Sequence, residues 1–140
     1  MSLSYRIMEP RDVAAGMSLV ELANWNQTAR EWDLFLDRSP SGCVVAEADG
    51  VVVGTATTLD YGPFAWISMV LVAQAFRHRG LASELLHDSM AWLRARGLTP
   101  VLDATPAGAA AYARLGFQPG FALARWQGTL AAATASDAAD

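Results

Sequence analysis

The chain has 140 residues, which suits one domain with a hydrophobic core of its own. Hydrophobic residues make up 53% of the chain and charged residues 17%, and this balance excludes an intrinsically disordered protein. The formal net charge of -4 argues against a general nucleic-acid-binding protein.

The cysteine content and the hydropathy pattern indicate which cellular compartment the protein occupies. The single cysteine, Cys43, excludes an internal disulfide framework and a cysteine-rich zinc site, and it fits a reducing compartment. Residues 1–12 are charged and lack the apolar run of a signal peptide. No stretch approaches the roughly 18 apolar residues that a membrane helix needs. We therefore expect a cytoplasmic protein that requires no metal and binds neither nucleic acid nor membrane.

The first half of the chain predicts two helices and four strands. A short strand at 5–8 precedes a helix that starts near Pro10 and runs to about residue 25. Thr28 is a good N-cap for a second helix at 29–36. Strand-like runs at 43–48 and 51–59 flank Asp49-Gly50, which is a strong type I′ turn signal. Residues 64–72 are almost wholly apolar, which is typical of a strand covered on both faces.

The second half predicts alternating helices and strands. The best helical pattern covers 81–96 and stops at Gly97. A strand at 100–104, an alanine-rich helix from Pro106 to Gly116 and a last strand at 121–126 follow. We expect one domain over 1–130 and a disordered tail over 131–140. Short turns join the middle strands, and the helix at 81–96 separates two strands that should be parallel. The fold class is therefore α/β (mixed α+β), with a mixed, mostly antiparallel central sheet and helices on both faces.

A basic loop precedes the helix at 81–96. Arg77, His78 and Arg79 stand directly before Gly80, and a helix begins at the next residue. The first N–H groups of a helix lack internal partners and lie at the positive end of its dipole, so such an end binds phosphate. Glycine allows close approach of a ligand, and arginine pairs with phosphate oxygens. The alternative is a solvated turn, because short glycine motifs are common.

Two motifs identify a family that this sequence resembles. Arg77-x-x-Gly80-x-Ala82 resembles the (Gln/Arg)-x-x-Gly-x-(Gly/Ala) signature of the GCN5-related N-acetyltransferases. The run from Tyr112 to Gly116-Phe117 is similar to the Tyr-x-x-x-Gly-Phe element of the same family. The two motifs span residues 64–117 with their flanking elements, and the order of elements agrees over 5–126. The resemblance implies a GNAT fold that uses acetyl-coenzyme A as cosubstrate and no metal.

The resemblance also implies which residues hold the coenzyme. The loop and the first helical turn would bind its pyrophosphate through Arg77, His78, Arg79, Gly80, Leu81, Ala82 and Ser83. The preceding strand would bind the pantetheine arm through the backbone of Met69, Val70, Leu71 and Val72. The family has a bulge at this point, which the letters themselves do not demonstrate, and the same residues could simply be buried core.

Two catalytic residues are expected on the same basis. Tyr112 is the candidate general acid, because a phenol with a pKa of about 10 can protonate a departing thiolate. The alternative is a structural tyrosine. Many members carry an asparagine where this chain has Asp103, so Asp103 is a candidate base facing the amine, or else a cap for the helix at Pro106. Asp60, Glu47 and water relays remain as other candidates for the base.

The acceptor site is expected between the first two helices and the turn at 60–64. Its candidates are Trp25, Asn26, Trp32, Tyr61, Phe64 and Trp66, of which Trp25 and Tyr61, with Asp60, are the predicted substrate-binding residues. Trp32 and Trp66 could instead be core. The expected function is acetyl transfer to a primary amine of a small molecule or peptide. The alternative is a non-catalytic acyl-coenzyme A sensor or partner module, and a homodimer or tandem domain could complete the site.

Overall fold

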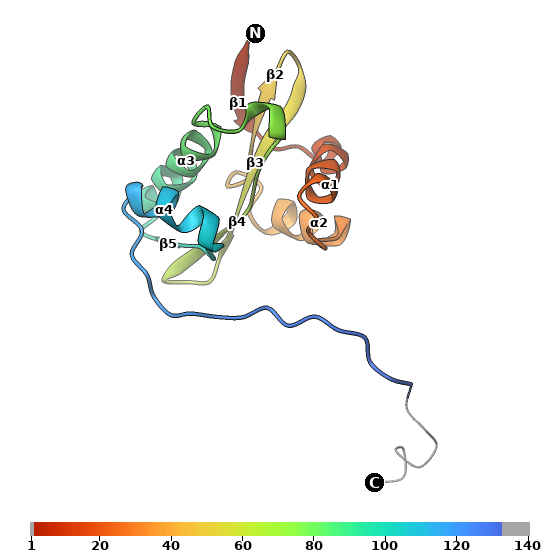
Figure 1. Ribbon diagram of the computed structural model, residues 1–140. Helices are drawn as coiled ribbons and strands as arrows, with labels where there is room; N and C mark the ends of the chain where they lie inside the picture. The colour runs from red at the N-terminus through yellow and green to blue at the C-terminus, as the bar shows by residue number, and fades with distance from the viewer. Residues whose placement is uncertain (1, 133–140) are drawn as a thin grey trace.

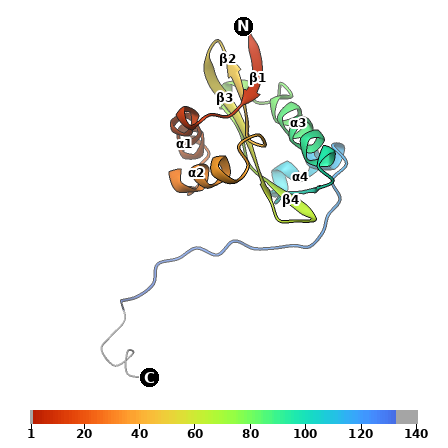
Figure 2. The same cartoon turned by 180° about the vertical axis from the view of Figure 1, so that it is seen from behind.

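The computed structural model describes residues 2–132, which form a five-stranded sheet with helices on both faces (Figures 1 and 2). The strands are β1 (Leu3–Ile7), β2 (Val44–Ala48), β3 (Val51–Asp60), β4 (Phe64–Val72) and β5 (Thr99–Val101). The helices are α1 (Val13–Leu22), α2 (Ala29–Arg38), α3 (Leu81–Ala95) and α4 (Pro106–Arg114), with short 3-10 turns η1 (Pro10–Asp12) and η2 (Gln74–Phe76). None of the helices in this part of the chain combines the length and apolar character needed to cross a bilayer.

The strands follow one another across the sheet in chain order. β1 to β4 pair antiparallel with their neighbours, and β5 pairs parallel with β4 after the crossover through α3. In both views α1 and α2 cover one face, whereas α3 and α4 cover the other (Figures 1 and 2). The predicted mixed, mostly antiparallel fold class is confirmed.

Local sequence signals explain where several elements begin. Asp49 and Gly50 both have positive φ, 51° and 82°, as the predicted type I′ turn between β2 and β3 requires. At the start of α2, the backbone N–H of Thr28 donates to the Glu31 carboxylate at 2.6 Å, completing a capping box. At the start of α4, Thr105 Oγ1 accepts from the Gly108 N–H at 3.2 Å. Thr105 therefore caps α4, and Asp103 does not.

The core fills both faces of the sheet. On the α1–α2 side, the fully buried Trp32 packs with residues of β2 and β4 such as Val45 and Leu71. On the α3 side, Leu85 and Leu86 belong to two further clusters of buried side chains. β4 contributes to the clusters on both faces, as its nearly continuous apolar sequence predicts.

A charged cluster joins the N-terminal strand to its neighbours. Arg6 donates to both carboxylate oxygens of Asp12 at 2.8 Å, and its Nε donates to Glu47 at 2.7 Å. The hydrogen bond from Arg6 is the main reason why the pKa of the buried Asp12 lies below its ordinary value. Asp12 also accepts the N–H of Glu9 at 2.8 Å, so the cluster fixes the entry to α1.

The last predicted strand is not formed. Residues 121–126 are unpaired, with Phe121 81% and Trp126 92% exposed, although Phe121 and Leu123 border the pockets beside β5. The chain leaves the body further along (Figure 1). The side chain of Arg125 donates to Asn26 at 2.5 Å. A physical reason is the weak edge that β5 offers, because it has three residues and Pro100 supplies no N–H. Of the predicted tail, residues 133–140 lie outside the described part of the chain.

Candidate active site

A bulge interrupts β4 at Met69. Thr55 pairs with Leu71 and Thr57 pairs with Ser68, so the single residue Ala56 faces two residues of β4. Met69 has a φ of 51°, in the left-handed region that methionine rarely adopts. Two buried threonines of β3 bind the carbonyls at this point: Thr55 Oγ1 donates to Met69 O at 2.7 Å and Thr57 Oγ1 donates to Ser68 O at 3.0 Å.

The bulge reverses the face of the sheet on which alternate side chains of β4 lie. Before it, Phe64, Trp66 and Ser68 alternate with buried residues and border a pocket beside α2. After it, Leu71 packs in the α1–α2 core, whereas Val70 packs on the α3 side. Within the described residues, the ladder between β4 and β5 ends at the pair Trp66–Val101. The strands therefore separate where the bulge begins, as the family resemblance predicted.

The loop after β4 presents a helix N-terminus to solvent. Gly80, the N-cap of α3, has a φ of 84°, and a Cβ built on it would meet nothing within 4 Å. The hydrogen bond from the Glu84 N–H to Gly80 O starts the helical ladder at 3.0 Å. The first-turn residues Ala82 and Ser83 are at least partly exposed, whereas Leu81 is a core residue. The space over Gly80 and the free first-turn N–H groups fit a phosphate group.

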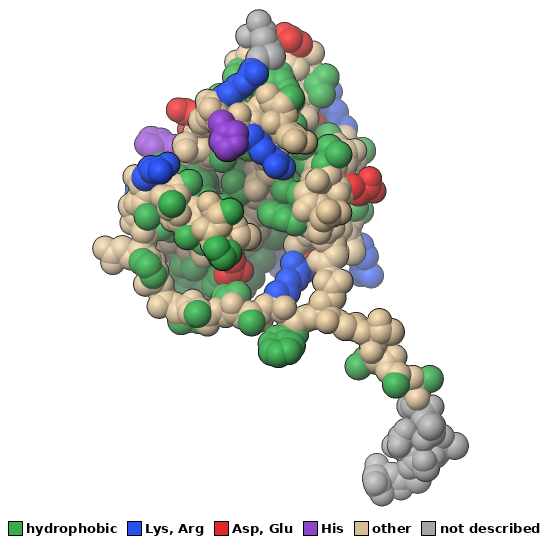
Figure 3. All heavy atoms as spheres, viewed as in Figure 1, with side chains coloured by type: hydrophobic (Ala, Val, Ile, Leu, Met, Phe, Trp, Pro, Cys, Tyr) green, Lys and Arg blue, Asp and Glu red, His purple; other side chains and the backbone are tan. Residues whose placement is uncertain are grey.

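The basic residues of this loop are exposed. Arg and His side chains gather at the end of the molecule where α3 begins, and the surface below them is hollowed (Figure 3). Arg77 Nε donates to the carbonyl of Val72 at 3.0 Å, so this side chain folds back over the end of β4. The guanidinium of Arg79 lies 5.5 Å from the ring centroid of Phe76. These contacts hold both arginines near the helix N-terminus.

A pocket of about 470 Å³ lies between α2 and the β3–β4 hairpin. Its apolar lining consists of Leu34, Phe35, Leu59, Tyr61, Phe64 and Trp66. Its polar lining consists of Glu31, Ser68 and Asp103. The pocket covers part of the region expected for the acceptor, namely the second helix and the turn but not the first helix, and Tyr61, Phe64 and Trp66 are the expected residues that line it.

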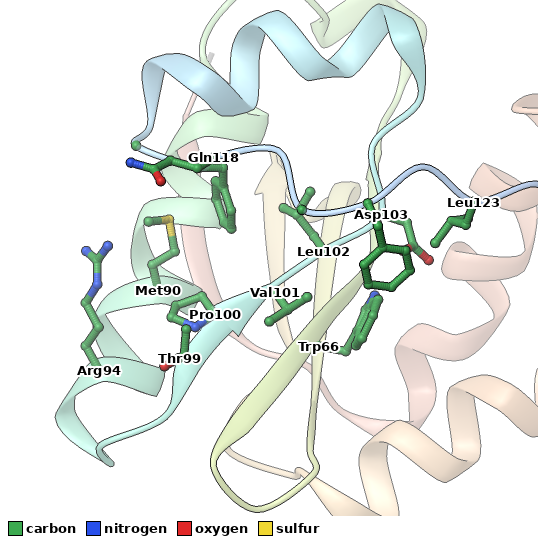
Figure 4. A pocket seen from close by; sticks show the side chains of 14 residues that line it. Trp66, Met90, Arg94, Thr99, Pro100, Val101, Leu102, Asp103, Gln118 and Leu123 are labelled. Carbon is green, nitrogen blue, oxygen red and sulfur yellow. The ribbon is translucent and has the colours of Figure 1, made fainter.

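Asp103 stands at the meeting point of three hollows. It follows β5, is exposed, and lines the pocket beside α2 together with two neighbouring pockets of about 430 and 370 Å³. Figure 4 shows it next to Trp66 in the first of these neighbours, with Leu123 of the extended C-terminal segment close by. A carboxylate in this position can reach a ligand in the α2 pocket and accept a proton from it.

Tyr112 lies on the other side of Asp103. Both residues line the hollow of about 370 Å³, and the Tyr112 ring packs edge-to-face on Phe117 with centroids 6.2 Å apart. A Cβ on Gly108 would come within 3.0 Å of this ring, so the ring rests on the glycine. Burial raises the pKa of Tyr112, which keeps the phenol protonated at neutral pH. The tyrosine is thus a structural contact of α4 and also an available proton donor.

Other predicted residues stand apart from the pocket. Trp25 follows the end of α1 and is 38% exposed, without lining the pocket beside α2. Asp60 accepts the Gly62 N–H at 2.7 Å and forms the hairpin turn. Trp32 is a fully buried core residue, and Glu47 is bound to Arg6. The roles of Trp25 and Asp60 remain predictions, whereas Trp32 is core.

Sequence reasoning missed Glu31 as a pocket residue, although it stands one turn before Leu34 and Phe35 on the same helix. Ser68 was considered only as a proton relay, and the period of β4 places it on the same side as Phe64 and Trp66. In residues 2–132, no group of three or more His, Cys, Asp or Glu side chains is placed to hold a metal ion.

Comparisons with known proteins agree on the family. The model of the acetyltransferase (GNAT) family matches residues 14–117. Among solved structures, Ard1 from Thermoplasma volcanium has a TM-score of 0.77 at 19% identity, over 84% of each chain. A predicted acetyltransferase from Clostridium acetobutylicum, solved with acetyl-CoA, has a TM-score of 0.71 at 16% identity, over 90% of this chain and 96% of the other.

One structural match is to a much longer chain. A Pyrococcus horikoshii protein matches with a TM-score of 0.74 at 21% identity, and the alignment covers 85% of this chain but 44% of that protein. No curated protein matches the chain at a significant level. At these identities the structural matches establish the fold, and the family model establishes the family.

Proposed function

Because this chain belongs to the acetyltransferase (GNAT) family, we propose that it transfers an acetyl group from acetyl-coenzyme A to a primary amine. The observation that carries this proposal is the placement of the β4 bulge between two different binding surfaces. One is the exposed N-terminus of α3 with Gly80, and the other is the pocket that ends at Asp103. A bound thioester and a bound amine could meet between them.

The coenzyme would be held by the backbone after the bulge and by the basic loop. The N–H groups of Ala82 and Ser83 at the α3 N-terminus suit its pyrophosphate, with Arg77 and Arg79 beside them. The backbone of Val70 and Val72 would bind the pantetheine arm where β5 no longer covers β4. The coenzyme supplies an acetyl group activated as a thioester. The Clostridium acetobutylicum structure with acetyl-CoA supports this assignment by analogy of fold.

The chain's own residues would move the protons of the reaction. Asp103 would accept a proton from the substrate ammonium, which leaves a neutral amine. The amine nitrogen then forms a bond to the thioester carbon, and the carbon–sulfur bond breaks. Backbone N–H groups at the bulge would polarise the carbonyl oxygen. Tyr112 would donate its proton to the departing sulfur. The nitrogen loses its second proton as the amide forms, and that proton would return the tyrosinate to the neutral phenol.

The test is thiol release from acetyl-coenzyme A in the presence of grouped amines. Tyr112→Phe should lower kcat by about 100-fold or more, which is typical for loss of a general acid, and leave coenzyme affinity unchanged. The matched control is Tyr5→Phe on β1, which should behave like the parent. An unchanged kcat in Tyr112→Phe would leave Tyr112 a structural residue.

The competing function is a binding module. If the parent binds acetyl-coenzyme A by calorimetry but releases no thiol with any amine, the chain is an acyl-coenzyme A sensor or partner domain. The cytoplasmic location and the homodimer stay predictions, and size-exclusion chromatography with light scattering would report the oligomeric state.

A further inference from the structure

We propose that the pocket beside α2 selects a primary amine with a single positive charge and an aryl or branched alkyl body. This inference rests on the acetyltransferase function proposed above and concerns the acceptor class. It follows from three features of the pocket: an aromatic wall, a polar inner end, and a limited number of charged groups.

The aromatic wall is a cluster of three rings on the β3–β4 hairpin. Tyr61 and Phe64 stack with centroids 5.6 Å apart and planes 10° apart. Trp66 meets both rings edge-on, at 6.4 Å from Tyr61 and 6.2 Å from Phe64. Tyr61 is 55% exposed, so its ring is accessible to a ligand that enters the pocket. On the opposite side, α2 contributes two apolar side chains, Leu34 and Phe35.

The polarity of the pocket changes along β4. Phe64, Trp66 and Ser68 follow one another on the same side of the strand, so the lining passes from aromatic to hydroxyl in the direction of the bulge. β5 ends at Val101, level with Trp66, and Asp103 follows two residues later and lines the same pocket as Ser68. The acidic end therefore lies next to the bulge. An amine should enter with its nitrogen toward Asp103 and its body against the rings.

The pocket offers few groups that can bind the polar or charged parts of an acceptor. Of its two carboxylates, Glu31 accepts the Thr28 N–H at 2.6 Å in the capping box and stands at the start of α2. Asp103 lies at the other end of the pocket, close to Ser68 and the bulge, so it is the carboxylate placed for the reacting nitrogen. A polyamine or an amino sugar would place further charges or hydroxyls against Leu34, Phe35 and the ring cluster, where polar groups lose hydrogen bonds to water. A volume of about 470 Å³ holds a phenylalkyl group with room to spare.

The experiment compares four amines in the thiol-release assay, with mass spectrometry of the acetylated product. The amines are 2-phenylethylamine, ethylamine, spermidine and glucosamine. We expect kcat/KM for 2-phenylethylamine to exceed that for each of the other three by about tenfold or more, as a filled apolar pocket provides. Every one of the chain's ten basic residues is an arginine, so no lysine of the enzyme competes as acceptor.

Variants of the ring cluster test the cause of the preference. Tyr61→Ala, at an exposed position, and Trp66→Leu should each lower kcat/KM for 2-phenylethylamine by about tenfold, mainly through KM. Each should lower kcat/KM for ethylamine much less, so that the ratio of the two values falls. Trp126→Ala, which removes a 92% exposed tryptophan far along the C-terminal segment, is the matched control and should change neither.

The possible results separate the two levels of the proposal. If spermidine or glucosamine is the best acceptor, or if neither ring variant alters the ratio of 2-phenylethylamine to ethylamine, the inference is overturned and the acetyltransferase function stands. If no amine is acetylated although acetyl-coenzyme A binds, the proposed function is overturned and the inference with it. Faster turnover of 2-phenylethylamine that is lost in Tyr61→Ala would support both.

Discussion

The two halves of β4 are built in different ways. The half after the bulge continues directly into the basic loop and α3, so residues 69–83 form one continuous segment of the chain. The half before the bulge borders a pocket whose other walls come from α2, from Tyr61 and from Asp103, far apart in the chain. The first surface offers mostly backbone groups and charge, whereas the second offers mostly side chains. Coenzyme binding should therefore respond to changes of charge and backbone, and acceptor choice to changes of side-chain shape.

The largest expected effect tests the charged surface. Arg77→Ala with Arg79→Ala should weaken acetyl-coenzyme A binding by about 3 kcal/mol or more, roughly 100-fold, because charged hydrogen bonds contribute about 1.5–3 kcal/mol each. Isothermal titration calorimetry measures the change. Arg38→Ala with Arg114→Ala removes the same charge from exposed positions on α2 and α4 and should leave the affinity nearly unchanged. If the two double variants bind acetyl-coenzyme A with equal affinity, the loop is not part of the coenzyme site.

The next effect tests the bulge at Met69, which joins the two halves of β4. Thr55→Val keeps the side-chain shape but leaves the buried carbonyl of Met69 without its 2.7 Å hydrogen bond. The free energy of unfolding should fall by about 1–3 kcal/mol, and coenzyme affinity should fall because the bulge is no longer fixed. Both are measured, by urea unfolding and by calorimetry.

A matched threonine separates stability from binding. Thr58→Val removes two buried hydrogen bonds that lie away from the bulge, one of 3.0 Å to Gly42 O and one of 2.8 Å with Ser39 Oγ. It should reduce stability at least as much as Thr55→Val but spare coenzyme affinity. A loss of affinity in Thr58→Val as large as in Thr55→Val would mean that general destabilisation, not the bulge, controls binding.

A smaller effect tests the backbone at the helix N-terminus. Gly80→Ala should cost about 1 kcal/mol of stability because of its positive φ, and its methyl group should lower coenzyme affinity by crowding the phosphate. Gly50→Ala is the control, because Gly50 has nearly the same φ of 82° and equally open surroundings in the β2–β3 turn. Thermal melts should shift alike in the two variants, while calorimetry should detect weaker binding for Gly80→Ala alone.

The smallest expected effect concerns the interaction between Arg6 and Asp12, which belongs to neither half of β4. Because Arg6 lowers the pKa of Asp12, their interaction stabilises the fold fully above the ordinary carboxyl pKa of about 3.9. This stabilisation is lost as the pH falls through the lower native pKa. In Asp12→Asn, the stability measured by urea unfolding should therefore change less between pH 5 and pH 2 than in the parent. Asp33→Asn, at an exposed site on α2, should retain the parent's acid dependence.

The difference between the halves also explains what could be predicted from the sequence. The turn at Asp49-Gly50, the cap at Thr28, the loop before α3 and the fold class depend on local patterns, and the structure agrees with each. The pocket depends on contacts between distant segments, so Glu31 was missed, and the choice between core and pocket could not be made for Trp32, which is core, or for Trp66, which lines the pocket. The prediction of a strand at 121–126 was wrong because a strand forms only against the edge of a neighbouring strand, and the local sequence pattern does not show whether such an edge exists.

The extra residue in β4 has a consequence for how the sequence can vary. In a regular strand, adding or removing one residue reverses the face of every side chain beyond it. Here that reversal is already taken up at Met69, which Thr55 holds from the neighbouring strand. As a result Val70, which would continue the face of Phe64 and Trp66 in a regular strand, packs on the α3 side instead. Substitutions at Phe64 or Trp66 therefore reshape a surface that Val70 does not share. Such a division would let the acceptor change during evolution while the coenzyme is retained.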